Sequence, residues 1–593
     1  MKLPVLLAAS CAVIALVCGV ASADSDFQTF DDHASSVIPR VLSASDVRLY
    51  REIFANERSG NFSEARQEVE ELSDRSLVGY AEAEHFLSPR ARRIPLAQLA
   101  AWLEKYDDLP VAPRVRELAE KRNRRHKVEL AAIAPVHMRG GWGYETADTR
   151  REAPLASEAA RSAETLIDND IRLDQPAQAE TALQTLTAAG VPSSDIAQLT
   201  RKVAAGYLAE GLDNDAYRLA MGVGGIDREA VPQLDWVAGL AAYRLSNYAD
   251  AAQRFEALAQ AGDATQWARS AGAFWAARAH LAAGDPLNVV TLLTAAAHEQ
   301  PTFYGMLAEQ LLGQEDHTQF TEPSLDTPSF ESLVQNEAAH RAVALWQIGE
   351  TDFVQPEMMR ALGALAPDQT AAFAALAHRM DLPDLELRAS ETQASRGVML
   401  TGLFPMPRYA PPGGYQVDPC LLFAFARVES RFEAKAVSNA GARGVMQIMP
   451  GTAQHVDGAK PEKSQLNNPA YSLGLGQKYL QELLGDVNGN LFQLAAAYNA
   501  GPAALTRWIG TRPSIADDPL LFIESIPVAE TRNYVKRVMT MYWLYGHRAG
   551  KSTPTLEETA EGKWPVYHSH QAPSTTPAPV TGTTLISDAS VPY

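Results

Sequence analysis

One glutamate in the second half of the chain has the setting that general acid chemistry requires. Glu429 closes an apolar run that begins just after Asp418 and Pro419. Aspartate is a favourable helix N-cap and proline suits the first helical position, so a helix is expected to start there. Glu429 then lies where a buried helix meets a loop. Partial burial raises the pKa of a carboxyl group, which keeps some acid form available at neutral pH.

The residues beside Glu429 do not supply a second catalytic carboxyl group. The segment offers only Glu433, one helical turn further on, and we expect it to be an exposed charge. Ordinary glycosidases place two carboxyl groups about the bond that they cleave. A single carboxyl suffices if the substrate provides its own nucleophile. We expect Ser430 to orient Glu429 by hydrogen bonding rather than to act as a nucleophile.

A glycine-rich segment over residues 438–453 follows, and it contains little charge. Its glycines permit tight turns. Met446 and Met449 offer adaptable apolar contacts, and Gln447 is a neutral hydrogen-bonding group. Such a wall suits a sugar that carries an acetamido group. One of the two methionines is expected in the core, with Met449 as the exposed one.

Four segments of this region recur together in a fixed order. They are Glu429-Ser430, residues 438–453, Ala497-Tyr498-Asn499-Ala500-Gly501-Pro502, and residues 524–535. In this order they resemble the catalytic domain of the soluble lytic transglycosylases, which cleave bacterial peptidoglycan. The resemblance runs from about Phe404 to Arg548. Val445 stands where the family usually has leucine, and Asn439 where it commonly has proline.

The resemblance implies a role for Glu429 as a single catalytic acid and base. It would first protonate the glycosidic oxygen between N-acetylmuramic acid and N-acetylglucosamine. It would then accept a proton from the muramyl C6 hydroxyl, which attacks the anomeric carbon and yields a 1,6-anhydromuramyl end. The implied enzyme is a carbon–oxygen lyase acting on a polysaccharide. Two alternatives stay open: a lysozyme-like muramidase that uses water, and a non-catalytic helical scaffold that binds glycan.

The resemblance also implies a set of substrate-binding residues. Those expected to line the groove and contact the acetamido group and sugar rings are Ser438, Gln447, Met449 and Tyr498. Tyr498 is also a candidate to bond to Glu429. Glu530 and Tyr534 match a family segment that reaches the cleft, although Glu530 could instead pair with Arg532 or Arg537. Asn499 is a substrate-binding candidate that could equally cap a helix.

Other chemistry is sparse. No pair of histidines has metal-ligand spacing, and Gly546–Ser552 is one residue short of a phosphate-binding loop. We therefore expect no metal and no organic cofactor. The net charge of −19, from 52 basic and 71 acidic residues, disfavours nucleic-acid binding, which depends on cationic side chains. Cys420 is expected to be a small buried residue.

The rest of the chain predicts a predominantly all-α protein. From Asp24 onward the apolar spacing is helical, and Ala241–Leu245 recurs 36 residues later as Ala277–Leu281. This spacing favours a superhelix of helical hairpins over residues 24–313. The resemblance implies that a helical linker domain over 314–400 joins it to a lysozyme-like domain over 401–549. The composition of residues 550–593 predicts a disordered tail. An irregular helical bundle is the alternative to the superhelix. Residues 401–550 carry a net charge of +3, against −22 for the remainder, which supports separate domains.

Residues 1–23 read as a cleaved signal peptide. Lys2 precedes an uncharged apolar stretch from Val5 to Val20, and Ala21-Ser22-Ala23 is a small-residue cleavage pattern. A retained membrane anchor is disfavoured because the apolar run is short for a bilayer. We expect a periplasmic protein whose partner is the peptidoglycan glycan strand. Association with the outer membrane, peripheral contact with the cell envelope and cell-wall enzyme partners are further possibilities.

Overall fold

In the computed structural model, the residues described are 38–124, 128–136, 154–314, 319–511 and 517–568. Within these ranges the chain is helical, and β pairing is limited to isolated bridges, so the all-α class is confirmed. None of these helices combines the length and apolar character needed to cross a bilayer. The predicted signal peptide, residues 1–23, lies outside the described residues.

The first helices of the chain share a hydrophobic core with the predicted linker domain. The N-terminal helices are α2 (Ala44–Ser59), α3 (Phe62–Glu70), α4 (Val78–Leu87), α5 (Leu96–Lys105) and α6 (Ala112–Asn123). The linker elements are α17 (Thr327–Leu333), α18 (Glu337–Ile348), η2 (Thr351–Phe353), α19 (Val354–Ala364), η3 (Pro367–Gln369), α20 (Thr370–Arg379) and α21 (Pro383–Ala394). A buried polar cluster joins the two sets: the Tyr80 hydroxyl and the Arg341 guanidinium each donate to Glu357 over 2.6 Å.

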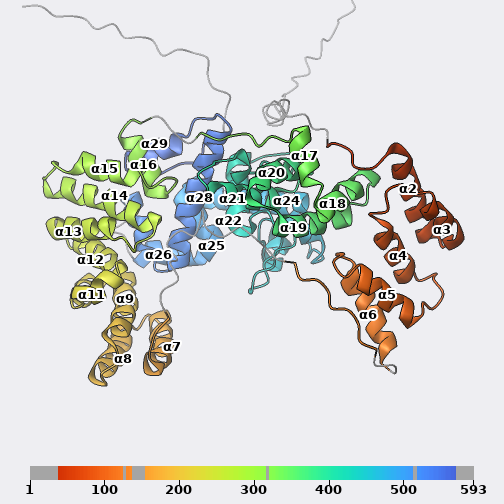
Figure 1. The fold of residues 1–593 in the computed structure, drawn as a ribbon. Coiled ribbons are helices and arrows are strands. Elements are labelled where there is room, and N and C mark those ends of the chain that lie inside the picture. The colour runs from red at the N-terminus through yellow and green to blue at the C-terminus, as the bar shows by residue number, and fades with distance from the viewer. Residues whose placement is uncertain (1–37, 125–127, 137–153, 315–318, 512–516, 569–593) are drawn as a thin grey trace, which may run out of the picture.

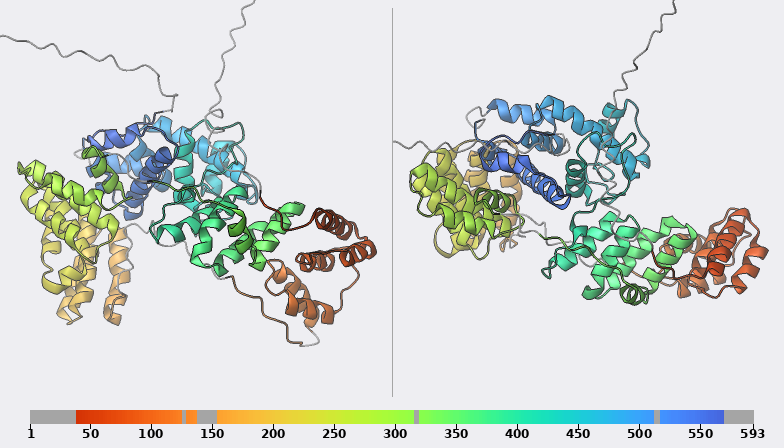
Figure 2. Two further views of the ribbon diagram at one scale, coloured as in Figure 1. Left: turned by 45° about the horizontal axis from the view of Figure 1, so that its top comes forward. Right: turned by 90° about the horizontal axis from the view of Figure 1, so that it is seen from above.

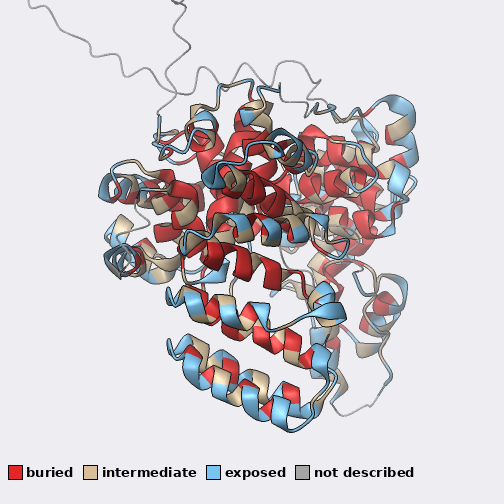
Figure 3. Cartoon of the chain, turned by 90° about the vertical axis from the view of Figure 1, so that its left-hand side faces the viewer, coloured by how far each residue is buried: buried red, intermediate tan, exposed pale blue. Residues whose placement is uncertain are grey.

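The next helices form an arm of helical hairpins. They are α7 (Glu158–Arg172), α8 (Pro176–Ala188), α9 (Ser193–Ala209), α10 (Asp213–Met221), α11 (Gly225–Ala230), α12 (Gln233–Arg244), α13 (Tyr248–Gln260), α14 (Gln266–Ala283), α15 (Val289–Ala297) and α16 (Phe303–Leu311). Small residues let these helices approach closely: a Cβ on Gly272 of α14 would lie 2.8 Å from the Phe255 carbonyl oxygen of α13. Buried residues face neighbouring helices, whereas the lowest helices in Figure 3 expose their outer faces.

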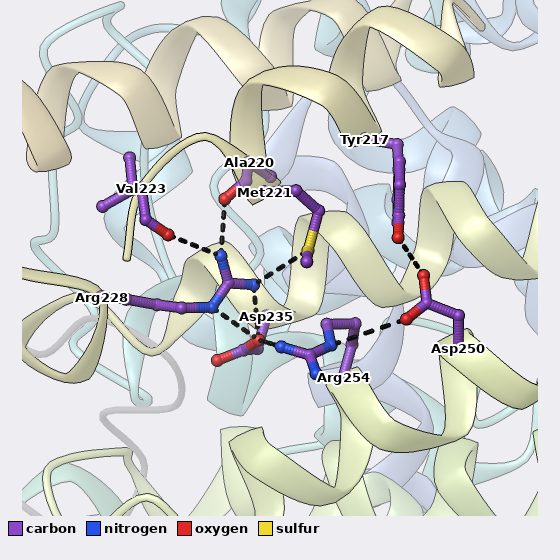
Figure 4. A network of polar contacts seen from close by, with 8 residues as sticks. All are labelled: Tyr217, Ala220, Met221, Val223, Arg228, Asp235, Asp250 and Arg254. Carbon is purple, nitrogen blue, oxygen red and sulfur yellow. Dashed lines mark hydrogen bonds and ion pairs between the residues drawn. The ribbon is translucent and has the colours of Figure 1, made fainter. Parts of the chain in front are cut away.

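An ion-pair network holds successive arm helices together (Figure 4). The Arg228 guanidinium donates to Asp235 over 2.6 Å and to the carbonyl oxygens of Ala220 and Val223. Arg254 extends the network from Asp235 to Asp250, and Asp250 accepts a hydrogen bond from Tyr217. Because half-buried charges are paired in this way, the arm tolerates polar groups between its helices.

The C-terminal domain packs against the arm in a second hydrophobic core. Its elements are η4 (Thr401–Leu403), α22 (Pro419–Ser430), α23 (Pro450–Asp457), η5 (Gln465–Asn467), α24 (Pro469–Asp486), α25 (Leu491–Ala500), α26 (Pro502–Thr511), α27 (Pro519–Ser525), α28 (Ala529–Arg548) and α29 (Pro554–Ala560). The arm and this domain meet through the Phe303 and Trp543 rings, stacked 5.3 Å apart, and through an ion pair of 2.7 Å between Arg278 and Asp518.

The single arm expected over residues 24–313 therefore divides into two units. Helices α2–α6 pack with α17–α21, and α7–α16 pack with the C-terminal domain. Figure 1 places α2–α6 and α7–α16 at opposite ends of the molecule, and the right-hand view of Figure 2 agrees. The division follows from the contacts rather than from local helix formation, because both stretches are equally helical.

The boundary predicted for the disordered tail is wrong at its beginning. Residues 554–560 form α29, which packs on α16. The Tyr567 hydroxyl accepts a hydrogen bond of 2.8 Å from the Asp418 backbone nitrogen, and the Trp564 ring lies 5.3 Å from Phe522. These contacts bury part of two aromatic side chains, which favours an ordered segment. Residues 569–593 of the predicted tail lie outside the described residues.

Candidate active site

Helix α22 positions Glu429, as the sequence predicts. The Asp418 side chain caps the helix by accepting from the Cys420 backbone nitrogen over 3.1 Å, and Pro419 is its first residue. The helix is buried along most of its length, including Cys420, which is a free thiol. It ends at Ser430, and its C-cap is Arg431, whose φ of 56° is left-handed. Glu429 therefore lies in the last turn of a rigid helix.

The Glu429 carboxyl group is partly buried and bonded to a tyrosine. The Tyr534 hydroxyl of α28 donates to its Oε1 over 2.5 Å. Burial raises the pKa of Glu429 to about 7, although the Tyr534 bond and the nearby charge of Arg537 lower it and the charge of Glu530 raises it. A carboxyl group with this pKa exists substantially as the acid at neutral pH, which is the state that a proton donor requires.

A second tyrosine, Tyr498 of α25, stands close by without bonding directly to Glu429. Its hydroxyl donates to the Met446 carbonyl oxygen over 2.8 Å. The ring of Phe425, one turn before Glu429, lies 4.8 Å from the Tyr498 ring and 6.2 Å from the Tyr534 ring. The bond to Glu429 that the sequence suggested for Tyr498 is thus made by Tyr534. Burial holds the pKa of both tyrosines well above the ordinary value, so both keep their protons.

The glycine-rich segment packs tightly behind the glutamate. Gly444 has a φ of +76°, and a Cβ there would lie 2.0 Å from the Leu466 carbonyl oxygen. The Ser430 hydroxyl lies 2.7 Å from the Val445 carbonyl oxygen, so it ties the end of α22 to this segment rather than bonding to Glu429. The Ser472 hydroxyl accepts from the Met446 backbone nitrogen over 3.2 Å. These contacts fix the position of Met446 relative to Glu429. Because Tyr498 bonds to the Met446 carbonyl oxygen, they also position Tyr498.

Two predicted sugar-binding residues in this segment stabilise its turns. The Ser438 hydroxyl accepts from the Ala442 backbone nitrogen over 3.0 Å. Gln447, which has a φ of 45°, donates its amide to the carbonyl oxygens of Ala436 and Gly444. Met449 is 40% exposed whereas Met446 is fully buried, as the sequence predicts.

The remaining predicted residues lie on α25 and at the start of α28. Asn499 lies within the last turn of α25, where Gly501 is the C-cap, and its Oδ1 accepts from the Thr531 hydroxyl over 2.6 Å. It joins α25 to α28 rather than capping its own helix. Glu530 is exposed and close enough to influence Glu429 electrostatically. Glu433 is an exposed charge, as expected, with 48% of its side chain accessible.

Sequence reasoning missed one contact that bears on the site. Arg431, two residues after Glu429, pairs with Glu391 of linker helix α21, a carboxylate with only 4% of its side chain exposed. Arg431 and the following Phe432 both have left-handed backbone angles, which are unfavourable for side chains with a Cβ. The buried partner on another domain helps to hold this strained turn. No sequence signal links two charges 40 residues apart in different predicted domains.

Replacing Glu391 by glutamine should loosen that turn. For the glycan cleavage that the family resemblance implies, we expect the rate to fall about tenfold with little change in KM. The variant removes an ion pair worth about 1.5 kcal/mol at a residue that does not contact the substrate. Glu433→Gln is the matched control, since Glu433 is exposed and lies 3.9 Å from Arg388. Steady-state kinetics of both variants would settle the point; equal rates for the two would contradict a positioning role for Glu391.

Replacing Tyr534 by phenylalanine should raise the pKa of Glu429, because the tyrosine bond lowers it in the native protein. The phenyl ring keeps the packing against Phe425. We expect the fall in activity at alkaline pH to move to higher pH and the maximal rate to drop about tenfold. Tyr217→Phe, which removes a tyrosine–carboxylate bond in the arm, should leave the pH profile unchanged. An unshifted profile for Tyr534→Phe would refute the coupling.

Comparison with known proteins identifies the class of this domain. Residues 411–520 match the family model of the transglycosylase SLT domain. The match spans the Glu429 helix, the glycine-rich segment and Tyr498. Residues 411–520 of the C-terminal domain are therefore similar to the transglycosylase SLT domain, and the resemblance drawn from the sequence is confirmed.

More specific likeness comes from individual proteins. The chain is 30% identical over 275 residues to the soluble lytic murein transglycosylase of Escherichia coli strain K12, covering 44% of this chain and 41% of that protein. It thus spans about two fifths of the length of this curated relative. Its fold is similar to the 70 kDa soluble lytic transglycosylase of Escherichia coli, with a TM-score of 0.52 and 20% identity over 88% of this chain and 99% of that one.

A second solved structure agrees. An inactive mutant of the lytic transglycosylase Slt from Pseudomonas aeruginosa has a TM-score of 0.52 and 21% identity, covering 86% of this chain and 74% of that one. These similarities confirm the predicted fold class, a helical superhelix with a lysozyme-like domain. Across the described ranges, no group of three or more histidine, cysteine or acidic side chains is arranged to hold a metal ion.

Proposed function

We propose that this protein is a peptidoglycan lytic transglycosylase with Glu429 as its single acid and base. The substrate is the β-1,4 bond between N-acetylmuramic acid and N-acetylglucosamine. The observation that carries the proposal is one carboxyl group with a pKa of about 7, held by Tyr534 within a domain similar to the transglycosylase SLT domain. Glu433, the nearest carboxyl group in sequence, is exposed and pairs weakly with Arg388.

The reaction requires Glu429 to donate one proton and then to accept another. In the first step Glu429 gives its proton to the glycosidic oxygen, and the bond from the anomeric carbon to that oxygen breaks. In the second step the muramyl C6 hydroxyl attacks the anomeric carbon and gives its proton to the Glu429 carboxylate. The cycle ends with Glu429 again in the acid form, and no water is consumed. Tyr534 stabilises the intervening carboxylate by hydrogen bonding.

The substrate-binding roles belong to the same proposal. Met449 offers an exposed apolar surface for a sugar ring, and Glu530 provides an exposed acceptor beside the acid. Tyr498, Asn499, Ser438 and Gln447 form hydrogen bonds within the protein, so we assign them first to shaping the wall that the sugar contacts. Substrate contacts by their remaining polar atoms complete the proposed site.

Mass spectrometry of digested peptidoglycan tests the reaction type. The full chain is incubated with purified sacculi in isotopically labelled water, and the soluble fragments are analysed. A lytic transglycosylase yields anhydromuramyl ends, lighter by one water and free of label. Reducing ends that carry labelled oxygen would instead identify a lysozyme-like hydrolase. Glycan binding without release of fragments would favour the scaffold alternative.

The pKa of Glu429 predicts the pH dependence of the reaction. The raised pKa means that the folded protein holds this proton more tightly than an ordinary glutamate does. Only the acid form starts the reaction, so activity should be flat below pH 6 and fall about tenfold per unit once the pH exceeds about 7. Initial rates on sacculi across pH 5–9 provide the measurement. A loss of activity beginning near pH 5 would contradict this assignment.

The proposed location follows from the substrate. The predicted signal peptide and a cell-wall polymer as substrate together support a periplasmic protein, cleaved after Ala23. Membrane fractionation of cells that produce the full chain would distinguish a free periplasmic protein from one associated with the outer membrane.

A further inference from the structure

A cavity of about 380 Å³ lies between the arm and the C-terminal domain. Helices α9, α12 and α14 of the arm border it on one side, and α28 borders it on the other. The α28 residues that line it follow one another at helical spacing and share one face: Ala529, Arg532, Asn533 and Lys536. Tyr534, whose hydroxyl bonds to Glu429, is not part of the lining. The cavity is therefore separate from the site around Glu429 but shares a helix with it.

Two tryptophans form the aromatic part of the cavity wall. Trp236 lies on α12 and Trp267 near the start of α14, and both are half-buried. Trp236 is held in place by contacts with the Phe255 and Trp275 rings, at centroid distances of 5.5 and 6.3 Å. An indole ring offers a broad apolar face and a single N–H donor. Such faces pack well on the C–H face of a sugar ring.

The charged side chains of the lining are already engaged within the protein. Glu524 accepts from Lys536 over 3.0 Å and from the Tyr304 hydroxyl over 2.6 Å. Arg532 donates to two backbone carbonyl oxygens, and Arg201 also has a partner. A charged ligand would have to displace these contacts at the cost of leaving buried groups unpaired, so the cavity favours a neutral ligand.

The unpaired hydrogen-bonding groups of the lining are neutral. Gln233 lies one turn before Trp236 on the same face of α12, and Asn533 lies across the cavity on α28. Neither amide forms a hydrogen bond with another residue in the part of the chain that the structure describes, and the same holds for the indole N–H groups of Trp236 and Trp267. A side-chain amide can both donate and accept, and so can the acetamido group of a sugar. The wall therefore combines aromatic faces with amides that suit an N-acetylated sugar.

We propose that this cavity is a second glycan-binding site, which holds one neutral N-acetylglucosamine unit against Trp236 and Trp267. The acetamido group bonds to Gln233 and Asn533, and its methyl group packs on the apolar wall beside the buried Leu240. The volume falls in the usual range for small-molecule pockets. This inference rests on the proposed function, because the sugar is a unit of the same polymer. A glycan strand bound here is held by the arm and the C-terminal domain together, away from the bond that Glu429 cleaves.

Hydrogen–deuterium exchange of the full chain tests the proposal. The probe is N,N′-diacetylchitobiose, which is neutral and has no muramyl unit to be cleaved, and the control is cellobiose, which lacks the acetamido groups. At twice its dissociation constant the probe should slow exchange about threefold in peptides that cover residues 233–244 and 266–274, because binding stabilises the closed state. Cellobiose should leave these peptides unchanged. Unchanged exchange with both sugars, or equal slowing by both, would overturn the proposal.

Two variants locate the binding. Gln233→Leu removes one amide from the wall, and the dissociation constant read from these peptides should rise about tenfold. Gln178→Leu is the matched control and should leave it unchanged, since this glutamine is exposed on α8 and does not line the cavity. Ala205→Phe fills the cavity from α9 and should abolish the slowing. A native response in both cavity variants would contradict the proposed site. Because no cleavage is measured, failure here is distinct from failure of the proposed function, which the products released from sacculi decide.

Discussion

Replacing Glu429 by glutamine should lower glycan cleavage by about a thousandfold, because the variant can neither give nor accept the proton that the reaction moves. Glutamine has nearly the same shape and can still accept the hydrogen bond from Tyr534. The measurement is the release of soluble fragments from sacculi at pH 6, where the native acid form predominates. Glu433→Gln is the matched control and should keep nearly full activity, since that side chain is exposed.

Stability measurements separate loss of chemistry from loss of fold in this variant. A pKa raised from 4.5 to about 7 means that folding disfavours the charged form of Glu429. The native protein therefore loses stability as the pH rises from about 5 to above 7, and the glutamine variant does not. At pH 8 the variant should be more stable by up to about 3 kcal/mol, and at pH 4 the difference should vanish. If Glu429→Gln kept more than a tenth of the native cleavage activity, another residue would have to be the catalytic acid and base.

Replacing Gly444 by alanine should destabilise the C-terminal domain by about 3 kcal/mol or more. The new Cβ would lie 2.0 Å from the Leu466 carbonyl oxygen and 2.7 Å from the Ser472 hydroxyl, and the backbone φ of +76° disfavours alanine. The segment must shift, and it carries the carbonyl groups that hold Ser430 and Tyr498. Activity should therefore fall together with stability.

Gly441 offers a control within the same segment. Its φ is +93°, but nothing lies within 4 Å of a Cβ built there. Gly441→Ala should therefore lower the free energy of unfolding by only about 1 kcal/mol, because alanine is unfavourable in a left-handed backbone conformation. Thermal unfolding of the two variants, followed by circular dichroism, compares the effects directly. Equal melting temperatures would show that the segment relaxes around Gly444 and that its close contacts are not restrictive.

The linker domain supports the proposed active site by helping to hold one end of helix α22. Glu391 of α21 pairs with Arg431 at the end of the helix that carries Glu429. The residues after α28 contribute as well, because Tyr567 accepts from the backbone of Asp418 at the other end of the same helix. Both ends of α22 are thus fixed by segments outside the predicted catalytic domain. This arrangement explains how one carboxyl group can be held in a partly buried setting.

The amino-acid sequence by itself determined the features that depend on local interactions. The cap at Asp418, the apolar face of α22 and the position of Glu429 in its last turn follow from neighbouring residues. The exposure of Met449 against the burial of Met446 was also predicted, and the family segments identified the domain. Helix caps and apolar spacing act over a few residues, so their effects can be read along the chain.

Only the tertiary structure decided which distant groups meet. In the folded protein Tyr534, rather than Tyr498, bonds to Glu429, and Arg431 pairs with Glu391. The helical arm is divided between two cores, and residues 554–567 are ordered. Each outcome depends on how helices far apart in sequence cross and pack. Many helical hairpins have equivalent apolar faces, and the free energies that choose among their pairings arise only when the surfaces are brought together.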